Sequence, residues 1–387
     1  MIESYWDREP YKNLFYYTVG DKRFQSDLQA YKYFSKNLNN EIRFNIGLKL
    51  MEMDWTKEPT ESIEHYRQLL CARLEDMYSN IMLGYSGGTD SETILECFFR
   101  RGTKNLTMLN IVNTLQQHTE TRQWLRDHTN QAVQQKWGQV ARQRNWNFRM
   151  WEAWQPTSHE SFEKDLTDYK SGSWTVEYRY LNAWSQNSGQ KTLTRNKGKK
   201  TCLVMGKEKP ELVIEDGWWC YKTLNLAWER PFDCVDPSTD LVMFWTNDIV
   251  PELCIKLAHA KAIEMEKVFI ENNIKPTTNN SIKQSIVMSP NYTRLNAAMG
   301  MKALTPFLDG NAQKTFGWFK KKEFEEQIAT GEKDPVNKKI IADRVFDEVL
   351  TKQIDNRFLD FNNKNLHGIW GKPIKVRPVC QQLREML

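Results

Sequence analysis

The clearest structural signal in the chain is the segment IMLGYSGGTDSETIL, residues 81–95. Its apolar start is typical of a buried strand, and SETIL opens a run with the spacing of a helix. Between them lie two glycines, which let the backbone come close to a ligand. A strand that ends in glycines and opens a helix presents backbone N–H groups and the positive end of the helix dipole to an anion. The stretch therefore predicts an anion-binding loop.

The polar residues of this loop indicate which anion it takes. The loop lacks the lysine of the G-x-x-x-x-G-K-[ST] phosphate loop and the G-x-G-x-x-G pattern of dinucleotide sites, so we expect neither. Asp90 is the informative residue, because a carboxylate repels a phosphate group unless a cation lies between them. A Mg²⁺ ion shared by Asp90 and phosphate oxygens removes that repulsion. We therefore expect a Mg²⁺–nucleotide site, to which Ser86, Thr89 and Ser91 add hydroxyl donors.

Strand-like and helix-like segments alternate from residue 81 onward. Residues 91–102 have helical spacing and end at a glycine, and residues 119–144 form a long polar helix pattern. Strands and helices in this order predict a parallel sheet with crossover helices. The strand-like runs are IMLGY (81–85), LTMLNIVN (106–113), FRMWEAW (148–154), TCLVMG (201–206), ELVIEDG (211–217) and LVMFWTND (241–248).

Segments outside this alternation also have readable patterns. Residues 14–24 predict a hairpin with its turn near Gly20 and Asp21. Residues 62–79 have apolar side chains at helical spacing and lead directly into the loop. Pro251 is well placed to begin another helix, since proline is favoured in the first turn.

Two segments carry a resemblance to a known family. Ser86-Gly87-Gly88-Thr89-Asp90-Ser91 resembles the S-G-G-x-D-S signature of the PP-loop ATP pyrophosphatases. TRLNAAMGMKALTPFLDG, residues 293–310, is similar to the asparagine synthetase segment that runs from an Arg, here Arg294, to P-F-L-D. We read the P-F-L-D residues as structural. The resemblance, which is closest to the synthetase domain of asparagine synthetase, implies cleavage of ATP between its α and β phosphates.

The alternation and the resemblance together predict an α/β fold. The expected architecture is a doubly wound parallel sheet, adenine nucleotide alpha hydrolase-like, with a small N-terminal α+β region and a helical C-terminal part. We expect the N-terminal region at 1–75, the PP-loop ATP pyrophosphatase domain at 76–320, and a helical extension with a basic tail at 321–387.

The resemblance assigns roles to individual residues. It implies that ATP and Mg²⁺ bind at the loop, with Asp90 as a metal ligand and catalytic residue. Topology alone suggests that backbone groups of Val112 and Asn113, at the end of the next strand, face the adenine. The residues expected to bind the nucleotide are Ser86, Gly87, Gly88, Thr89, Asp90, Ser91, Val112 and Asn113.

The chain also departs from asparagine synthetase in two places. Ile2 follows Met1 where the family carries a catalytic Cys, so we expect no glutamine hydrolysis. The family's G-E-G-A-D-E loop is absent, and its nearest counterpart is VMGKEKPE. In that segment Lys207 is our candidate for neutralising pyrophosphate charge, and Glu208 for holding Mg²⁺. Glu215 and Asp216 are rivals for the metal role.

The leading hypothesis is an ATP-dependent adenylating ligase, similar to asparagine synthetase. It would cleave ATP to AMP and pyrophosphate to activate a carboxylate or amide oxygen for attack by an amine or ammonia. One alternative is a PP-loop enzyme that modifies a nucleobase or nucleic acid, which the basic segment 191–200 favours. Lys372, Lys375 and Arg377 could contact such a polyanion or close over the phosphates, although a solvated basic tail is the simpler interpretation. Another alternative is a non-catalytic nucleotide-binding module.

Composition limits the class of protein further. The chain has 387 residues and a formal net charge of +5, which permits but does not require a polyanionic partner. Its 7 cysteines contain no C-x-x-C pair, which argues against a zinc ribbon or an iron–sulfur cluster. No signal peptide or membrane span is evident, so we expect a cytoplasmic protein without membrane association. The sequence leaves the acceptor substrate and a homo-oligomer open.

Overall fold

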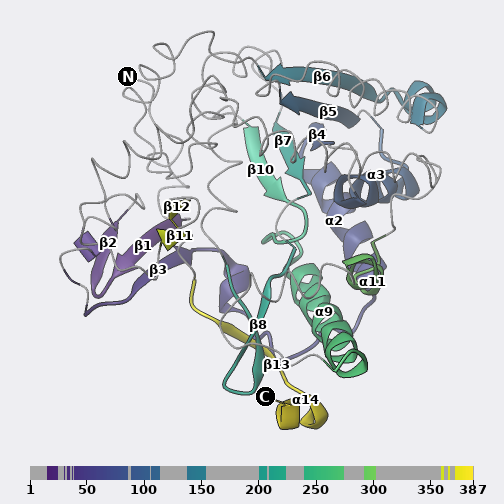
Figure 1. The fold of residues 1–387 in the computed structure, drawn as a ribbon. Coiled ribbons are helices and arrows are strands. Elements are labelled where there is room, and N and C mark those ends of the chain that lie inside the picture. The colour runs from purple at the N-terminus through teal and green to yellow at the C-terminus, as the bar shows by residue number, and fades with distance from the viewer. Residues whose placement is uncertain are drawn as a thin grey trace, which may run out of the picture.

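A computed structural model of the chain describes its secondary structure, core and polar contacts over part of its length (Figure 1). No helix among those residues is long and apolar enough to cross a membrane. The residues described are 15–24, 30, 33–34, 37, 39–85, 89–104, 106–113, 137–153, 200–206, 209–223, 239–273, 292–301, 359–360, 365–366 and 371–386.

A five-stranded parallel sheet forms the centre of the described structure. Its strands lie in the order β10-β7-β4-β5-β6, and every neighbouring pair is parallel. The chain therefore runs outward from β4 to β6 on one side and returns to lay β7 and β10 on the other. The strands are β4 (Asn80–Gly84), β5 (Leu106–Asn113), β6 (Asn147–Ala153), β7 (Thr201–Met205) and β10 (Thr239–Met243).

This strand order creates a topological switch point between β4 and β7. The connection after β4 leads to β5, toward one edge of the sheet, and the connection after β7 leads to β10, toward the other edge. In open α/β sheets, ligands bind in the crevice outside the carboxyl ends of the strands at such a point. The end of β4 and the start of α3 (Thr89–Arg101), which flank residues 86–88 in the sequence, lie at that position.

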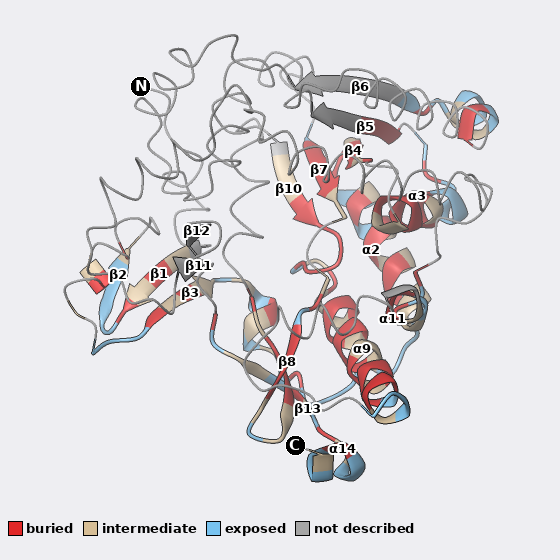
Figure 2. Cartoon of the chain, in the orientation of Figure 1, coloured by how far each residue is buried: buried red, intermediate tan, exposed pale blue. Residues whose placement is uncertain are grey.

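Alternation along the strands decides which side chains enter the main core. In β4, Ile81 and Leu83 face the core, whereas Met82 points to the opposite face and packs with Leu109 and Leu203. Helices α2 (Ile63–Met77) and α3 (Thr89–Arg101) contact each other and supply the other half of this core. Figure 2 shows buried residues on β4, β7, β10 and the inner faces of these helices. Helix α3 thus rests on the strand that precedes it.

A second core lies around the longest described helix, α9 (Pro251–Glu271), in which a proline occupies the first turn. It packs against the antiparallel sheet β13-β9-β8. Asp216 and Gly217, both with positive φ, form the two-residue turn between β8 and β9. The associated elements are β8 (Leu212–Glu215), β9 (Trp218–Tyr221), β13 (Ile374–Pro378), α14 (Gln381–Met386) and α11 (Tyr292–Ala298).

The smaller elements complete the described structure. Strands β1 (Phe15–Val19) and β2 (Lys22–Phe24) form the expected hairpin around Gly20, which has φ +60. The three-stranded antiparallel sheet β2-β1-β3 contains both of them. The remaining elements are β3 (Ile42–Ile46), the 3-10 helix η3 (Lys49–Glu52), β11 (Leu359–Asp360) and β12 (Asn365–Leu366).

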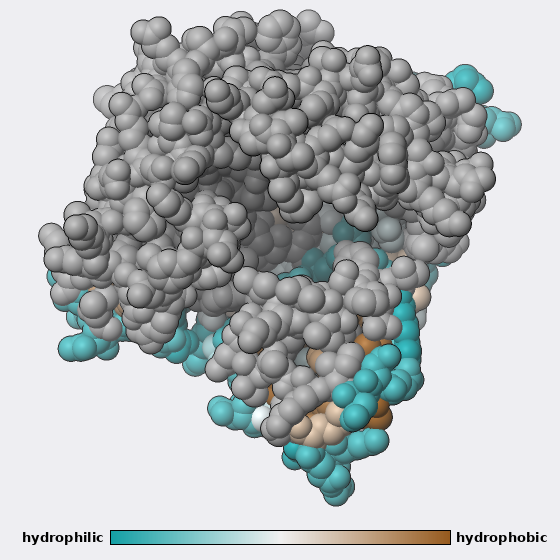
Figure 3. Space-filling model, viewed as in Figure 1, coloured by the Kyte–Doolittle hydropathy of each residue, from teal (hydrophilic) through white to brown (hydrophobic). Residues whose placement is uncertain are grey.

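The described surface is mainly hydrophilic on the face drawn in Figure 3. Among the described residues, the exposed large hydrophobic side chains are Met77 and Phe99, each on a helix that packs against the parallel sheet. Single exposed hydrophobic residues of this kind are ordinary for a folded protein. They give no evidence of a docking surface.

The expected fold class is confirmed: the chain is α/β with a parallel sheet and a small antiparallel sheet near its N-terminus. Two features differ from the sequence patterns. The run 211–217 belongs to a separate antiparallel sheet, because β8 pairs with β9 and not with β7. Part of the expected basic tail forms strand β13, which pairs with β9. Nζ of Lys375 in this strand lies 5.2 Å from the centroid of the Trp218 ring.

We predict that Ser62→Ala lowers the free energy of unfolding by about 1 kcal/mol, because it removes the N-cap of α2. The Ser62 hydroxyl accepts a hydrogen bond from the backbone N–H of His65 at 3.1 Å. Urea denaturation followed by circular dichroism measures the change. The exposed Thr60→Ala serves as the control, and an equal loss in both variants would contradict the capping role.

Candidate functional site

Helix α3 begins at the switch point and positions Asp90 in its first turn. The Asp90 side chain is 28% exposed, so its carboxylate is accessible to a ligand. Ser91 next to it is buried, and the Thr93 hydroxyl donates to the backbone carbonyl of Thr89 at 2.7 Å. This local bond holds the first turn of the helix. An acidic residue is favoured there by the helix dipole.

Lys209, which follows β7, reaches the same point from the neighbouring strand. Its Nζ donates to Asp90 Oδ1 at 2.9 Å and to Asn296 Oδ1 at 3.2 Å. Asp90 lies 119 positions from Lys209 in the sequence, and Asn296 lies 87. The Lys209 side chain is only 13% exposed, and Asn296 is buried. Three distant segments therefore converge on one partly enclosed ammonium group.

Two glycines let these segments come close together. A Cβ atom on Gly206 would lie 3.0 Å from Cδ1 of Ile94 and 3.4 Å from backbone and side-chain atoms of Asp90. A Cβ atom on Gly84 would lie 2.5 Å from Sδ of Met205. A side chain at position 206 would therefore crowd Ile94 of α3, and one at position 84 would require the flexible Met205 side chain to move.

A hydrogen bond joins the residues that precede and follow the glycine-rich loop in the sequence. The hydroxyl of Tyr85 donates to Glu92 Oε2 at 2.7 Å, and Nε1 of Trp137 lies 3.4 Å from the same oxygen. Burial and the neighbouring Glu92 carboxylate raise the pKa of Tyr85, so its hydroxyl stays protonated at neutral pH. The backbone N–H of Tyr85 also bonds to Leu109 O at 2.8 Å. These contacts fix the chain immediately before and after the loop.

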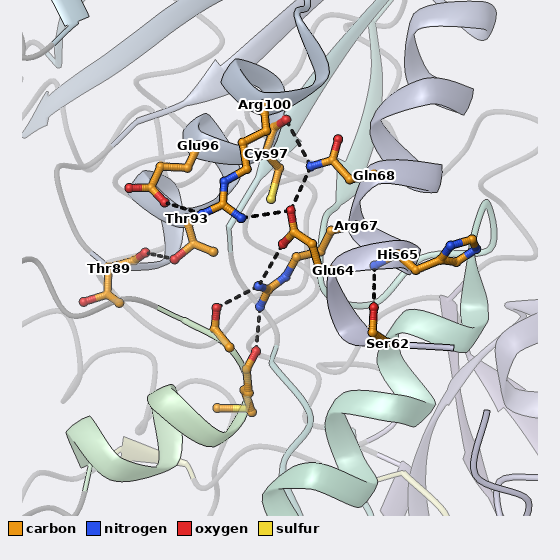
Figure 4. A network of polar contacts seen from close by, with 12 residues as sticks. Ser62, Glu64, His65, Arg67, Gln68, Thr89, Thr93, Glu96, Cys97 and Arg100 are labelled. Carbon is orange, nitrogen blue, oxygen red and sulfur yellow. Dashed lines mark hydrogen bonds and ion pairs between the residues drawn. The ribbon is translucent and has the colours of Figure 1, made fainter. Parts of the chain in front are cut away.

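Arg67 of α2 holds the segment that contains Asn296. Its guanidinium donates to the carbonyl oxygens of Gly300 at 2.7 Å and Met299 at 2.6 Å (Figure 4). Gly300 has φ +66, and the turn is closed by a bond from Met301 N to Asn296 O at 2.7 Å. The buried arginine therefore anchors the end of α11 to the helix that leads into the site.

Helices α2 and α3 are connected by a further polar network (Figure 4). Glu64 Oε1 accepts from Arg100 at 3.2 Å and from Gln68 at 3.1 Å. Gln68 also lies 3.4 Å from the carbonyl oxygen of Cys97. The helix that bears Asp90 is thus linked to the helix that bears Arg67.

The structure describes only some of the residues expected from the sequence. It brings Thr89, Asp90 and Ser91 to the switch point. Val112 and Asn113 end β5, the strand beside β4 in the sheet, and pair with the end of β6. Ser86, Gly87, Gly88, Lys207, Glu208 and the residues 305–309 lie outside the described residues.

The rival metal ligands have other contacts. Glu215 forms an ion pair with Lys222, and Asp216 occupies the turn of the β8–β9 hairpin. Figure 1 shows this hairpin beside β13 and away from α3. Arg294, expected from the family segment, pairs with Glu264 and Glu271 of α9. These residues stabilise the second core, and none of them contacts Asp90 in the described bonds.

Lys209 and Asn296 were not among the site residues predicted from the sequence. Lys209 lies two residues after the nominated Lys207 in the same segment, and only the path of the chain beyond β7 distinguishes them. Asn296 was inside the segment that resembles asparagine synthetase, but as one polar residue of a helix pattern. Its buried amide next to a lysine is visible only in three dimensions.

The described residues contain no group of three or more His, Cys, Asp and Glu side chains that could hold a metal ion. A Mg²⁺ ion that arrives with a nucleotide needs fewer ligands from the protein than such a group provides. Mg²⁺ in nucleotide sites commonly takes one or two carboxylates from the protein and its other ligands from phosphate and water. Asp90 supplies one accessible carboxylate for that arrangement.

Comparison with solved structures gives a distant match to the NMN synthetase from Francisella tularensis. The sequences are 15% identical and the TM-score is 0.25. The match covers 38% of this chain and 54% of the synthetase, so the chain spans about half the length of that structure. No family model and no curated protein matches. We base the functional proposal on the strand order and on the contacts around Asp90.

We predict that Arg67→Met lowers the free energy of unfolding by about 2 to 4 kcal/mol, because the buried carbonyl oxygen of Met299 and the partly buried one of Gly300 lose their donor. Urea denaturation measures the loss. Arg101→Met is the matched control, since Arg101 is 46% exposed and pairs only with Glu75 in the described contacts. It should cost less than about 1 kcal/mol. Similar costs for both variants would show that Arg67 does not anchor the turn.

Proposed function

We propose that the chain is an ATP-dependent adenylating ligase. ATP binds at the loop between β4 and α3, and an oxygen of a second substrate attacks the α phosphorus. The bond to the β phosphate breaks and pyrophosphate leaves, so AMP becomes attached to the acceptor oxygen. An amine or ammonia then attacks the activated carbon and releases AMP. The acceptor is a carboxylate or an amide oxygen.

The observation that supports this proposal is the convergence of Asp90 and Lys209 at the switch point. A carboxylate and an ammonium group lie 2.9 Å apart where α3 begins. The helix N-terminus and Lys209 both favour anionic oxygens. Asp90 does not favour them unless a cation accompanies the anion. A triphosphate with its divalent ion satisfies all three groups, whereas a free phosphate ion does not.

The residues at the site have different roles in this reaction. Mg²⁺, when bound with ATP at Asp90, would neutralise phosphate charge and stabilise the departing pyrophosphate. Lys209 would donate to the same phosphate oxygens. The Tyr85–Glu92 bond and the Arg67 anchor hold the framework that carries them. The contribution of the protein is positioning and charge stabilisation.

We predict that Asp90→Asn lowers the formation of AMP and pyrophosphate from ATP by at least about a hundredfold, since it removes the carboxylate that holds the metal. Purified protein, Mg²⁺ and ATP labelled in the α phosphate are incubated with carboxylate and amide acceptors, each with ammonia. Labelled AMP is then separated from ADP by chromatography. Product appearing only as ADP and phosphate would refute adenylation.

Asp216→Asn is the matched control for this experiment. Asp216 has φ 49, and Asn tolerates that conformation well, so the hairpin should keep its fold. We expect unchanged AMP formation in this variant. Loss of activity in Asp216→Asn together with normal activity in Asp90→Asn would move the metal site to the hairpin and overturn our assignment.

A further inference from the structure

We propose that Lys209 acts as an internal counter-ion that a divalent cation displaces: it neutralises Asp90 when the site is empty, and moves to phosphate oxygens when the metal occupies Asp90. The inference rests on the proposed function for the identity of the phosphate. The competition between Lys209 and a metal ion for Asp90 depends on the geometry alone.

The ion pair already occupies the ligand that the metal needs. Lys209 Nζ lies 2.9 Å from Asp90 Oδ1, and the two side chains are 13% and 28% exposed. In this partly enclosed position, solvent screens the pair less than it would on an open surface. A divalent ion that binds Asp90 brings a second positive charge against the ammonium group. Repulsion between the two cations therefore favours the departure of one from the carboxylate when the other binds.

Asn296 gives Lys209 a second hydrogen-bond partner that remains when the contact with Asp90 is lost. Its amide oxygen accepts from Lys209 Nζ at 3.2 Å, and it is a neutral group that does not compensate the ammonium charge. Asn296 is buried and its backbone is fixed by Met301. Once Asp90 is taken by the metal, this contact keeps Lys209 at the switch point, although its ammonium group no longer pairs with Asp90. A phosphate oxygen beside the start of α3 is the natural new partner.

This arrangement has a signature that a purely structural ion pair lacks. Removing the ammonium group should strengthen the binding of a divalent cation alone, because its competitor for Asp90 is gone. The same change should weaken the binding of pyrophosphate with the metal present, because one of its donors is gone. Loss of a structural strut would weaken both.

The test uses the full chain without ATP or acceptor. Mn²⁺ serves as the probe for the divalent ion, and its binding is measured by electron paramagnetic resonance of the free ion. We expect Lys209→Met to bind Mn²⁺ about fivefold to tenfold more tightly than the wild type, given the partial burial of the pair. Lys209→Arg keeps the charge and should bind Mn²⁺ within about twofold of the wild type. Asp90→Asn combined with Lys209→Met should abolish the gain.

The second measurement is calorimetric titration of inorganic pyrophosphate into protein held at saturating Mn²⁺. We expect Lys209→Met to bind pyrophosphate at least about tenfold more weakly, the scale of a lost charge-assisted hydrogen bond. Thermal melting of each variant checks that it folds. Lys209→Gln, which keeps a donor for Asn296, repeats both measurements if the methionine variant melts early.

Two results would overturn the inference. Unchanged or weaker Mn²⁺ binding in both neutral variants would show that Lys209 does not compete for Asp90. A stronger Mn²⁺ site with unchanged pyrophosphate binding would show that Lys209 does not move to phosphate. Neither measurement involves AMP formation, so a failure of the adenylating function would be seen separately, in the assay with labelled ATP.

Discussion

The ion pair between Asp90 and Lys209 is the interaction on which the candidate site depends. A carboxylate in the first turn of a helix suits the helix dipole but opposes the anion that the glycine-rich loop would attract. The conflict is resolved by a cation within reach, and Lys209 supplies one at 2.9 Å. That distance exists only because β7 lies directly beside β4 in the sheet. Strand order therefore sets the electrostatics of the site.

The remaining framework limits the freedom of the three segments that meet there. Gly84 and Gly206 permit the close approach of the strand ends, and Arg67 fixes the turn after α11 from the opposite side. The buried guanidinium donates to the buried carbonyl oxygen of Met299 and to the partly buried one of Gly300. The polar contacts of Arg67 thus connect α2, the helix before the loop, to the segment that contains Asn296.

Much of the fold could be predicted because strands and helices leave local patterns. The apolar runs at 81–85, 106–113 and 201–206 are strands of one sheet, and Ser62 does begin the helix that precedes the loop. The partner of β8 could not be predicted in this way, since its apolar run does not say which strand lies next to it. The adjacent Asp-Gly pair at 216–217 was a hairpin signal that the sequence analysis did not use.

The site was predictable only where its residues lie on one continuous segment. Asp90 follows from the loop pattern, since the chemistry of a carboxylate among glycines is local. The roles of Lys209 and Asn296 depend on long-range contacts. Lys209 lies 119 positions from Asp90 in the sequence, and Asn296 lies 87 positions from Lys209, so no local pattern predicts either contact. Lys207 and Lys209 are both lysines and lie two positions apart, so the sequence alone does not indicate that Lys209 is the one beside Asp90.

A site that contains its own counter-ion behaves differently from a permanent phosphate cradle. With Asp90 and Lys209 paired, their two charges offset each other, so the pair itself has little attraction for a free phosphate ion. A metal ion that takes Asp90 makes the site more cationic, because it adds positive charge while Lys209 is released from its pairing with Asp90. Affinity for the anion is therefore coupled to the presence of the metal. Such coupling favours the binding of a metal ion and an anion together over the binding of either component alone.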